Sequence, residues 1–356
     1  MLELDDAERL PRSGRPSLVC IVSAAAVFSL ALGLSAPGEA QVLLPAEDQG
    51  SIVTVRVEND VTGSTDEYYS SGVALGWTGP TGAVPGFIAR AGHALLGDGD
   101  QRVSIDLSQQ IYTPSDTQIN PPDPNDRPYA ATLLLTGQLI QDTLLTRTRL
   151  GAQVGVLGPD AGGEIVQNGF HTIIGDEKNQ GWDDQLDNRP VLNFFADRTW
   201  RLPLLSLASL PALNTAPMAV DVLPDVTGFV GTEQIYAQAG GTLRIGQGLE
   251  DDFGAGRITP GTDGGDAYLP DAGFAWYVFG GVDGRAVAYN TLLEGNSFAD
   301  GPSVDKMPFV GEFVLGLAMI WHGVRMTFSQ TWQTHEFTSQ QGGLFDFGSV
   351  AVSARF

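Results

Sequence analysis

The residues best suited to acid–base chemistry lie in one polar stretch, residues 158–188. If this stretch is helical, Glu164, Asn168 and His171 recur at positions i, i+4 and i+7 and share one face. Two acidic residues follow in the same stretch, Asp176 and Glu177. A histidine beside carboxylates can act as a general base close to a cation site. The spacing therefore makes His171 the candidate base, although spacing of this kind is also common by chance.

The other histidines lack such neighbours in the sequence. We interpret His93, His322 and His335 as loop or interfacial residues. The single cysteine, Cys20, excludes a thiolate metal cluster, and the sequence contains no H-E-x-x-H, EF-hand or P-loop motif. Catalysis by this chain would therefore depend on histidine, carboxylate, amide and hydroxyl groups.

A second polar group follows an alternating apolar run, SIVTVRVEND. Val53, Val55 and Val57 share a strand face with Asn59, and Asp60 comes next. If the valines face lipid, the amide of Asn59 faces lipid too, which is costly unless another element covers it and bonds to it. The alternative is that Asn59 and Asp60 merely begin a turn, as these residue types often do.

A hydroxyl group follows in TDEYYSSGVALGW, where Ser70 precedes a face rich in glycine and alanine. The surroundings of Ser70 do not form G-x-S-x-G, and a nucleophilic serine would need a histidine and an orienting carboxylate. The structural alternative is that Ser70 is a small residue that lets another element pack closely.

The elements that must position these residues are strands. Many segments of 9–14 residues alternate with period two, such as Leu150–Val156, whose polar face continues upstream in Arg147 and Arg149. Arginines opposite an apolar face suit a barrel with a polar interior in lipid, and membrane-spanning strands need about 9–11 residues. Periodicity alone does not exclude a soluble β-sandwich.

The strands predicted from this pattern number twelve when residues 274–290 are one strand. Asp283-Gly284 could instead form a hairpin turn there and give thirteen, but single-chain bacterial barrels have an even number of strands. The predicted ranges are 52–60, 70–79, 102–113, 129–141, 145–157, 189–200, 218–230, 233–247, 274–290, 308–321, 324–336 and 345–356. The fold class is therefore all-β: a twelve-stranded antiparallel transmembrane β-barrel with a helical excursion, 158–188, between strands 5 and 6.

The end of the chain and its aromatic residues agree with an outer-membrane barrel. SVAVSARF places Val350, Val352 and Ala354 on one face with the final Phe356, a pattern common in such barrels. Aromatic residues near predicted strand ends are expected to form interfacial girdles: Trp77, Tyr112, Trp200 and Trp321.

Targeting and charge narrow the class of protein further. Residues 17–36 form an apolar run preceded by Arg9, Arg12 and Arg15 and followed by small residues, which predicts a secretory signal peptide over 1–40 and a mature barrel over 41–356. A membrane anchor is the alternative, because the run is long enough to span. The formal net charge of −23 argues against a nucleic-acid partner and suits divalent cations.

Four segments together carry a resemblance to a known family, the lipid A 3′-O-deacylases of Gram-negative outer membranes. They are VENDVTGSTDEYYSSG (57–72), QQIYTPSD (109–116), DRPYA (126–130) and GVLGPDAGGEIVQNGFHTIIGDEKNQGWDDQLDNR (155–189). The resemblance is dense over the first half of the mature chain. In the second half only QTHEF (333–337) resembles a family segment, and weakly.

The resemblance implies a calcium-dependent esterase that removes the 3′-acyloxyacyl group of lipid A, with its site between the barrel wall and the helical excursion. It implies that His171 activates water, that Asn59, Asp60 and Ser70 belong to the site, and that Glu177 is needed for activity. Asp60 is the first choice for a Ca²⁺ ligand, followed by Glu177. One departure is DTQINPP (116–122), where some members carry basic residues suited to a substrate phosphate.

The expected partners follow from this hypothesis. They are lipid A or lipopolysaccharide as substrate and the lipids of the outer membrane, reached by export through the periplasm; no obligate protein partner is expected. The alternatives are a passive pore with 158–188 as a constriction or plug, an outer-membrane phospholipase with a serine nucleophile, and a soluble secreted β protein.

Overall fold

The computed structural model describes residues 43–60, 67–207, 217–261, 263–269, 273–295 and 301–356. Its strands form one antiparallel sheet that closes on itself, because β1 pairs with both β2 and β13, and β6 pairs with β8. The strands are β1 (Ile52–Asn59), β2 (Tyr68–Thr78), β3 (Asp100–Thr113), β4 (Ala130–Asp142), β5 (Thr146–Leu157), β6 (Arg189–Trp200), β7 (Leu202–Leu207), β8 (Met218–Gly231), β9 (Gln234–Gln247), β10 (Phe274–Asn290), β11 (Phe309–Trp321), β12 (Val324–Gln333) and β13 (Phe345–Arg355).

The barrel wall has twelve strand positions, as the sequence predicts. The short β7 begins one residue after β6 and pairs with the same neighbour, β8, so that β6 and β7 together act as one interrupted strand. β10 runs unbroken through Asp283 and Gly284, so the alternative hairpin does not form.

Alternation along the strands separates a lipid face from a polar lumen. In β1, Val55 and Val57 are exposed on the outside, while Arg56 and Glu58 are buried inside. The inward arginines pair with carboxylates of neighbouring strands, as Arg147 does with Asp142 at 2.7 Å. Apolar side chains therefore face outward and charges inward, the arrangement expected of a barrel in a bilayer.

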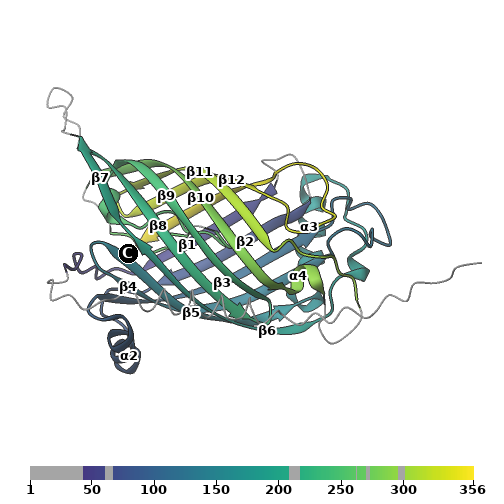
Figure 1. Ribbon diagram of the computed structural model, residues 1–356, viewed down its shortest axis with the longest axis horizontal. Helices are drawn as coiled ribbons and strands as arrows, with labels where there is room; N and C mark the ends of the chain where they lie inside the picture. The colour runs from purple at the N-terminus through teal and green to yellow at the C-terminus, as the bar shows by residue number, and fades with distance from the viewer. Residues whose placement is uncertain (1–42, 61–66, 208–216, 262, 270–272, 296–300) are drawn as a thin grey trace, which may run out of the picture.

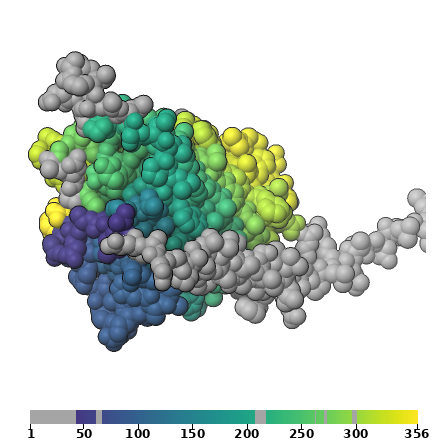
Figure 2. Space-filling model, turned by 60° about the vertical axis from the view of Figure 1, so that its left-hand side comes forward, coloured from purple at the N-terminus to yellow at the C-terminus, as the bar shows by residue number. Residues whose placement is uncertain are grey.

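The two ends of the barrel differ in their connections (Figure 1). One end carries the C-terminus and α2 (Gly86–Leu96), and there Ser51 N donates to the carbonyl of Phe356. Figure 2 turns this side forward, with the first described residues in purple beside C-terminal residues in yellow. The other end carries α3 (Gly163–Ile174), α4 (Thr291–Glu294) and the long connections 114–129 and 158–188. We call it the excursion end, and long loops place it at the cell exterior.

Some features of the fold were not predicted. His93, expected to be a loop or interfacial residue, lies in the unpredicted helix α2. Tyr112, expected in an interfacial girdle, faces the lumen because it follows the inward phase of β3. Trp77 and Trp321 do lie exposed on the outer face. Among the described residues, no helix combines the length and the hydropathy that crossing a membrane requires. The predicted signal peptide, 1–40, lies outside the described residues.

The largest unpredicted feature is the connection between β9 and β10, which folds back into the lumen. We call its described residues, 249–261 and 263–269, the lumenal segment. It begins at the end that carries the C-terminus, where Asp252 pairs with Arg244 and Arg325. Further along, Arg257 pairs with Glu312 of β11 at 2.8 Å. The segment therefore fills much of the barrel and neutralises charges that the strands direct inward.

A candidate active site on the outer face of the barrel

Helix α3 lies outside the barrel wall with its polarity reversed relative to a helix of a soluble protein. Its buried residues are Gly163, Gln167 and His171, whereas Ile165 and Ile173 are 79% and 83% exposed. An apolar helix face directed away from the protein suits contact with acyl chains. The polar face of the helix, with His171, is turned toward the protein.

A glycine allows this helix to lie close to the wall. A Cβ on Gly163 would come within 2.5 Å of the Ala131 Cβ and 2.8 Å of the Trp182 ring. Ala131, Tyr129 and Trp182 form a small apolar cluster on the outside of the wall, and Gln109 of β3 donates to the carbonyl of Ala161 at 2.6 Å. Helix α3 contacts β3 and β4 as a result.

The imidazole of His171 is oriented by the chain that follows its own helix. Gly175 ends α3 in the left-handed conformation, with φ +80°, and Asp176 N donates back to the carbonyl of His171. The reversal places the carbonyl of Glu177 2.6 Å from His171 Nδ1. Because a carbonyl oxygen only accepts hydrogen bonds, Nδ1 donates in this bond, and in a neutral imidazole held this way Nε2 is the nitrogen that can accept a proton.

A side-chain amide holds this reversal in place. Asn168 Oδ1 accepts from Asn179 N at 2.8 Å, and Asn168 Nδ2 donates to the carbonyl of Asn179 at 3.3 Å. The amide of Asn168 thus bonds to both the N–H and the carbonyl of Asn179 in the returning chain. Glu177 lies in the chain between Asp176, whose N donates to the carbonyl of His171, and Asn179, so its own carbonyl has a defined position beside His171 Nδ1.

Asn59 and Ser70 lie side by side on the outer wall at the excursion end. Asn59 continues the outward face of Val55 and Val57, as the sequence pattern predicts, and its Nδ2 donates to the carbonyl of Ser70 at 2.8 Å. Asn59 is half-buried and Ser70 is buried. The amide is therefore bonded to protein, as an outward polar group at membrane depth must be.

Ser70 owes its orientation to an irregularity in β2. The register of β2 against β3 shifts between Tyr69 and Ser71, which leaves Ser70 as the extra residue of a bulge. Its hydroxyl lies 2.6 Å from the hydroxyl of Thr113, which ends β3. Within the described ranges, Ser70 makes no hydrogen bond to a histidine, as a serine nucleophile would require.

Asp60 follows directly after β1 and is only 1% exposed. Its Oδ2 accepts from Glu67 N at 2.7 Å, so this carboxylate joins the two ends of the β1–β2 connection. Burial, and after it the negative charge of Asp126, raises the pKa of the neighbouring Glu67.

The predicted site residues thus form two groups. His171 and Glu177 meet through a backbone carbonyl, and Asn59, Asp60 and Ser70 gather at the ends of β1 and β2. The two groups share the outer side of the excursion end, because α3 rests on β3, the strand that bears Thr113. The side chain of Glu177 is exposed rather than turned toward His171.

The predicted calcium site is not marked by a cluster of acidic side chains in the described part of the chain. Within the described ranges, no three His, Cys, Asp or Glu side chains stand close enough to hold a metal ion. A Ca²⁺ shell also takes backbone carbonyl, amide and water oxygens, so this finding does not decide whether Asp60 or Glu177 binds calcium. Calcium therefore stays a prediction from the resemblance.

The helical spacing groups Glu164 with His171, and the sequence gives no sign of Thr113 as the partner of Ser70. The buried polar stripe is Gln167 with His171, spaced i and i+4, whereas Glu164 is exposed. Thr113 was not singled out because its pairing with Ser70 depends on the bulge. Arg127, the first basic residue after 116–122, is buried and pairs with Glu336 at 3.1 Å.

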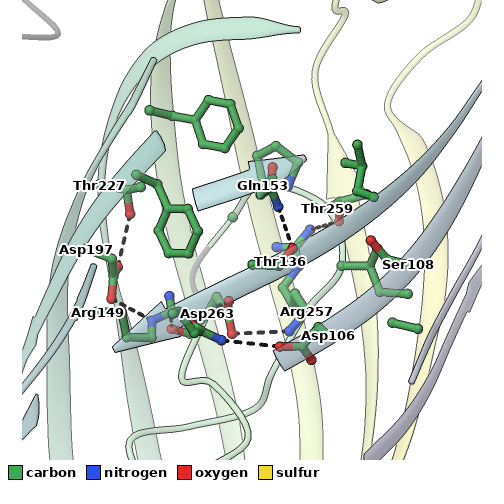
Figure 3. A pocket seen from close by; sticks show the side chains of 18 of the residues that line it. Asp106, Ser108, Thr136, Arg149, Gln153, Asp197, Thr227, Arg257, Thr259 and Asp263 are labelled. Atoms are coloured by element: carbon green, nitrogen blue, oxygen red, sulfur yellow. Dashed lines mark hydrogen bonds and ion pairs between the residues drawn. The ribbon is translucent and has the colours of Figure 1, made fainter. Parts of the chain in front are cut away.

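A cavity of about 130 Å³ lies in the lumen and not at the predicted site (Figure 3). Its lining includes Arg149, which pairs with Asp197 and Asp263, and the hydroxyl groups of Ser108 and Thr227. None of Asn59, Asp60, Ser70, His171 or Glu177 lines it. The arginines around this cavity, Arg56, Arg149 and Arg257, are each paired with a carboxylate, which indicates a structural interior.

Comparison with solved structures supports the architecture. The chain resembles LpxR from Salmonella typhimurium with a TM-score of 0.69 and 24% sequence identity, covering 86% of this chain and 100% of that one. The β domain of the Bordetella autotransporter BrkA gives a TM-score of 0.38 at 10% identity, covering 88% of this chain and 99% of that one. No curated relative matches the chain.

A protein-family model matches almost the whole chain and so shows the family. The family model described as "Outer membrane protein LpxR" matches residues 22–356, which include every strand and the excursion that bears His171. The family and the outer-membrane location predicted from the sequence are thereby confirmed. This chain belongs to the LpxR family of outer membrane proteins.

Proposed function

We propose that the protein is an outer-membrane esterase that hydrolyses the 3′-acyloxyacyl ester of lipid A, with His171 as general base. The observation that carries this proposal is the hydrogen bond from His171 Nδ1 to the carbonyl of Glu177, 2.6 Å long. The bond fixes the tautomer in which Nε2 can accept a proton. Membership of the family and the sequence resemblance to lipid A deacylases supply the substrate class.

The reaction can be written with these groups alone. Water attacks the ester carbonyl carbon while His171 Nε2 takes one of its protons, which gives a tetrahedral oxyanion and an imidazolium. Collapse of the oxyanion breaks the carbon–oxygen bond to the sugar. The imidazolium returns the proton to the departing oxygen, so that the acyl chain leaves as an acid and the sugar keeps a hydroxyl group. No acyl-enzyme forms.

The outer-wall residues are proposed to position the reactants. Ser70 and Thr113 present a hydroxyl pair, and Asn59 is oriented by its bond to Ser70. Bound Ca²⁺, if Asp60 and Glu177 contribute to its site, would supply positive charge for the developing oxyanion. The exposed apolar face of α3 would lie among the acyl chains of the outer leaflet, which supports a lipid as substrate.

The proposal is tested with purified protein, lipid A in detergent micelles and added Ca²⁺. We expect release of the 3′-acyloxyacyl acid, its loss in His171→Ala, and full activity after treatment with a fluorophosphonate. Fluorophosphonate inhibition with the label on Ser70 would instead identify a serine nucleophile of the phospholipase type. Absence of any released acid from the folded wild-type protein would refute the deacylase.

A further inference from the structure

The lumenal segment reaches the back of the candidate site through the barrel wall. Its residues 257–260 lie near the excursion end of the lumen, where Arg285 donates to the carbonyl of Pro260 at 3.2 Å and Gln110 donates to the carbonyl of Ile258 at 3.2 Å. Arg257 and Thr259 are drawn among the strand side chains in Figure 3. These residues contact strands on opposite sides of the barrel.

The contact nearest to the candidate site is a carboxylate with four donors. Glu58 Oε1 accepts from Ile258 N at 2.8 Å, and Oε2 accepts from Thr259 N at 3.2 Å and from the Thr259 hydroxyl at 3.1 Å. The hydroxyl of Tyr69 also donates to Oε2, at 2.9 Å. Glu58 has no exposed surface. We call Glu58, Tyr69 and Thr259 the lumenal clamp.

Each strand residue of the lumenal clamp is the chain neighbour of a site residue. Glu58 faces inward and Asn59, the next residue, faces outward. Tyr69 likewise faces inward and precedes Ser70, the bulge residue on the outer wall. The clamp therefore fixes the inner side of the two strand ends whose outer sides bear Asn59 and Ser70.

The backbone around this point is held in an unusual conformation. Tyr68 has φ +60°, in the left-handed region that non-glycine residues seldom adopt. Such conformations persist where surrounding contacts fix them, and they cluster at functional sites. Here the ring of Tyr68 packs against Phe337 and Phe345. Gly72 leaves room for the Tyr69 hydroxyl, because a Cβ there would collide with it.

We propose that Glu58 is a positioning residue for the reaction: from inside the barrel it fixes the places of Asn59 and Ser70 on the outside. The lumenal segment thus acts as the inner support of the active-site wall and does more than fill the barrel. This inference rests on the proposed function, because positioning has a catalytic meaning only if Asn59 and Ser70 serve the reaction.

Two variants test the lumenal clamp. Tyr69→Phe removes one hydroxyl and keeps the ring, and Glu58→Gln replaces an acceptor oxygen with an amide nitrogen that cannot accept. We expect each variant to lower kcat on lipid A micelles by tenfold or more while KM and the folded fraction stay at wild-type values. A role confined to folding would instead lower the folded fraction and leave the kcat of the folded protein unchanged.

The matched control is Glu312→Gln. Glu312 is a buried carboxylate that accepts from Arg257 of the same segment, but it lies on β11, three strands away from β1 around the barrel. We expect wild-type kcat for this variant. A loss equal to that of Glu58→Gln would overturn the proposal, because it would show a general effect of loosening the lumenal segment.

Hydrogen–deuterium exchange of peptides from β1 and β2 provides a measurement that does not depend on activity. Amides near Asn59 and Ser71 should exchange faster in Tyr69→Phe and Glu58→Gln than in the wild type or Glu312→Gln. Unchanged exchange would refute the claim that Glu58 and Tyr69 hold Asn59 and Ser70 in place, whether or not the wild type is active. Faster exchange together with an inactive wild type would refute the proposed function and confine the clamp to structure, which also overturns the inference.

Discussion

His171 and Glu177 show how one backbone hydrogen bond can define a catalytic group. The backbone carbonyl of Glu177 sets the tautomer of His171, and the carboxylate of Glu177 takes no part in that bond. That side chain is exposed, and the resemblance to lipid A deacylases makes it a candidate cation ligand. At the scale of single residues, these two contributions of Glu177 can be separated by mutation.

Glu177→Gln should preserve the hydrogen bond to His171, because that bond uses the backbone. We expect the variant to need a higher Ca²⁺ concentration for half-maximal activity and to approach wild-type kcat at saturating Ca²⁺. The measurement is a Ca²⁺ titration of activity after removal of divalent ions with EDTA. Activity that is indifferent to EDTA in both proteins would refute the calcium site.

Glu233 gives the folded barrel a pH dependence. It lies between β8 and β9, where burial raises its pKa from 4.5 to about 7, although a hydrogen bond from Asn193 opposes the rise. A raised folded-state pKa means that the stabilisation is complete below pH 4.5 and is lost as the pH rises through 7.

Glu233→Gln should therefore stabilise the protein at pH 8 and not at pH 4. The gain at pH 8 should reach about 3 kcal/mol, since one pKa unit corresponds to about 1.4 kcal/mol. Denaturant unfolding in micelles at the two pH values measures the difference in the free energy of unfolding. An equal gain at both values would contradict the assignment, because it would be independent of ionisation.

At the scale of elements, the position of α3 depends on its first residue. Gly163→Ala would place a methyl group against Ala131 and Trp182 and lift the helix from the wall. We expect deacylase activity to fall by tenfold or more while the barrel remains folded. The measurement is acyl release by folded protein in micelles.

Gly169→Ala is the matched control, because a Cβ at Gly169 meets nothing within 4 Å. Alanine also favours a helix over glycine by up to about 1 kcal/mol. We expect wild-type activity from this variant. If both alanine variants lost activity equally, close packing of α3 against the wall would not be the cause.

The elements were predictable where the bilayer imposes a pattern. Twelve strand ranges follow from the alternation of apolar and polar residues. Lipid outside the barrel and charged groups inside it require this alternation along strands such as β1 and β5. β7 escaped prediction because a single residue, Arg201, separates it from β6. The lumenal segment escaped because its glycines and aspartates resemble those of a loop, and its arginine partners come together only once the barrel closes.

The candidate site was predictable in part for similar reasons. Asn59 drew attention because it is a polar residue on a valine face, and His171 because of its polar neighbours and the resemblance. Ser70 with Thr113 depends on a bulge that no residue pattern announces. The burial of Gln167 beside His171 depends on how α3 packs against the wall, which helical spacing does not specify.

At the scale of the whole molecule, the lumenal segment argues against a conducting pore. It pairs with arginines of several strands, among them Arg244 and Arg325, and the pocket that it lines together with Arg149 has a volume of about 130 Å³. We expect no porin-like conductance when the purified barrel is inserted into planar bilayers, with an open porin as positive control. A steady conductance that rises with salt would restore the pore hypothesis.

The central claim is that this outer-membrane barrel removes an acyl unit from lipid A through His171. The most direct measurement is mass spectrometry of lipid A from a Gram-negative strain that expresses the protein, beside one that expresses His171→Ala. We predict loss of one acyloxyacyl unit with the wild type and intact lipid A with the variant, at equal amounts of folded barrel. Intact lipid A in both strains, with calcium supplied, would contradict the claim.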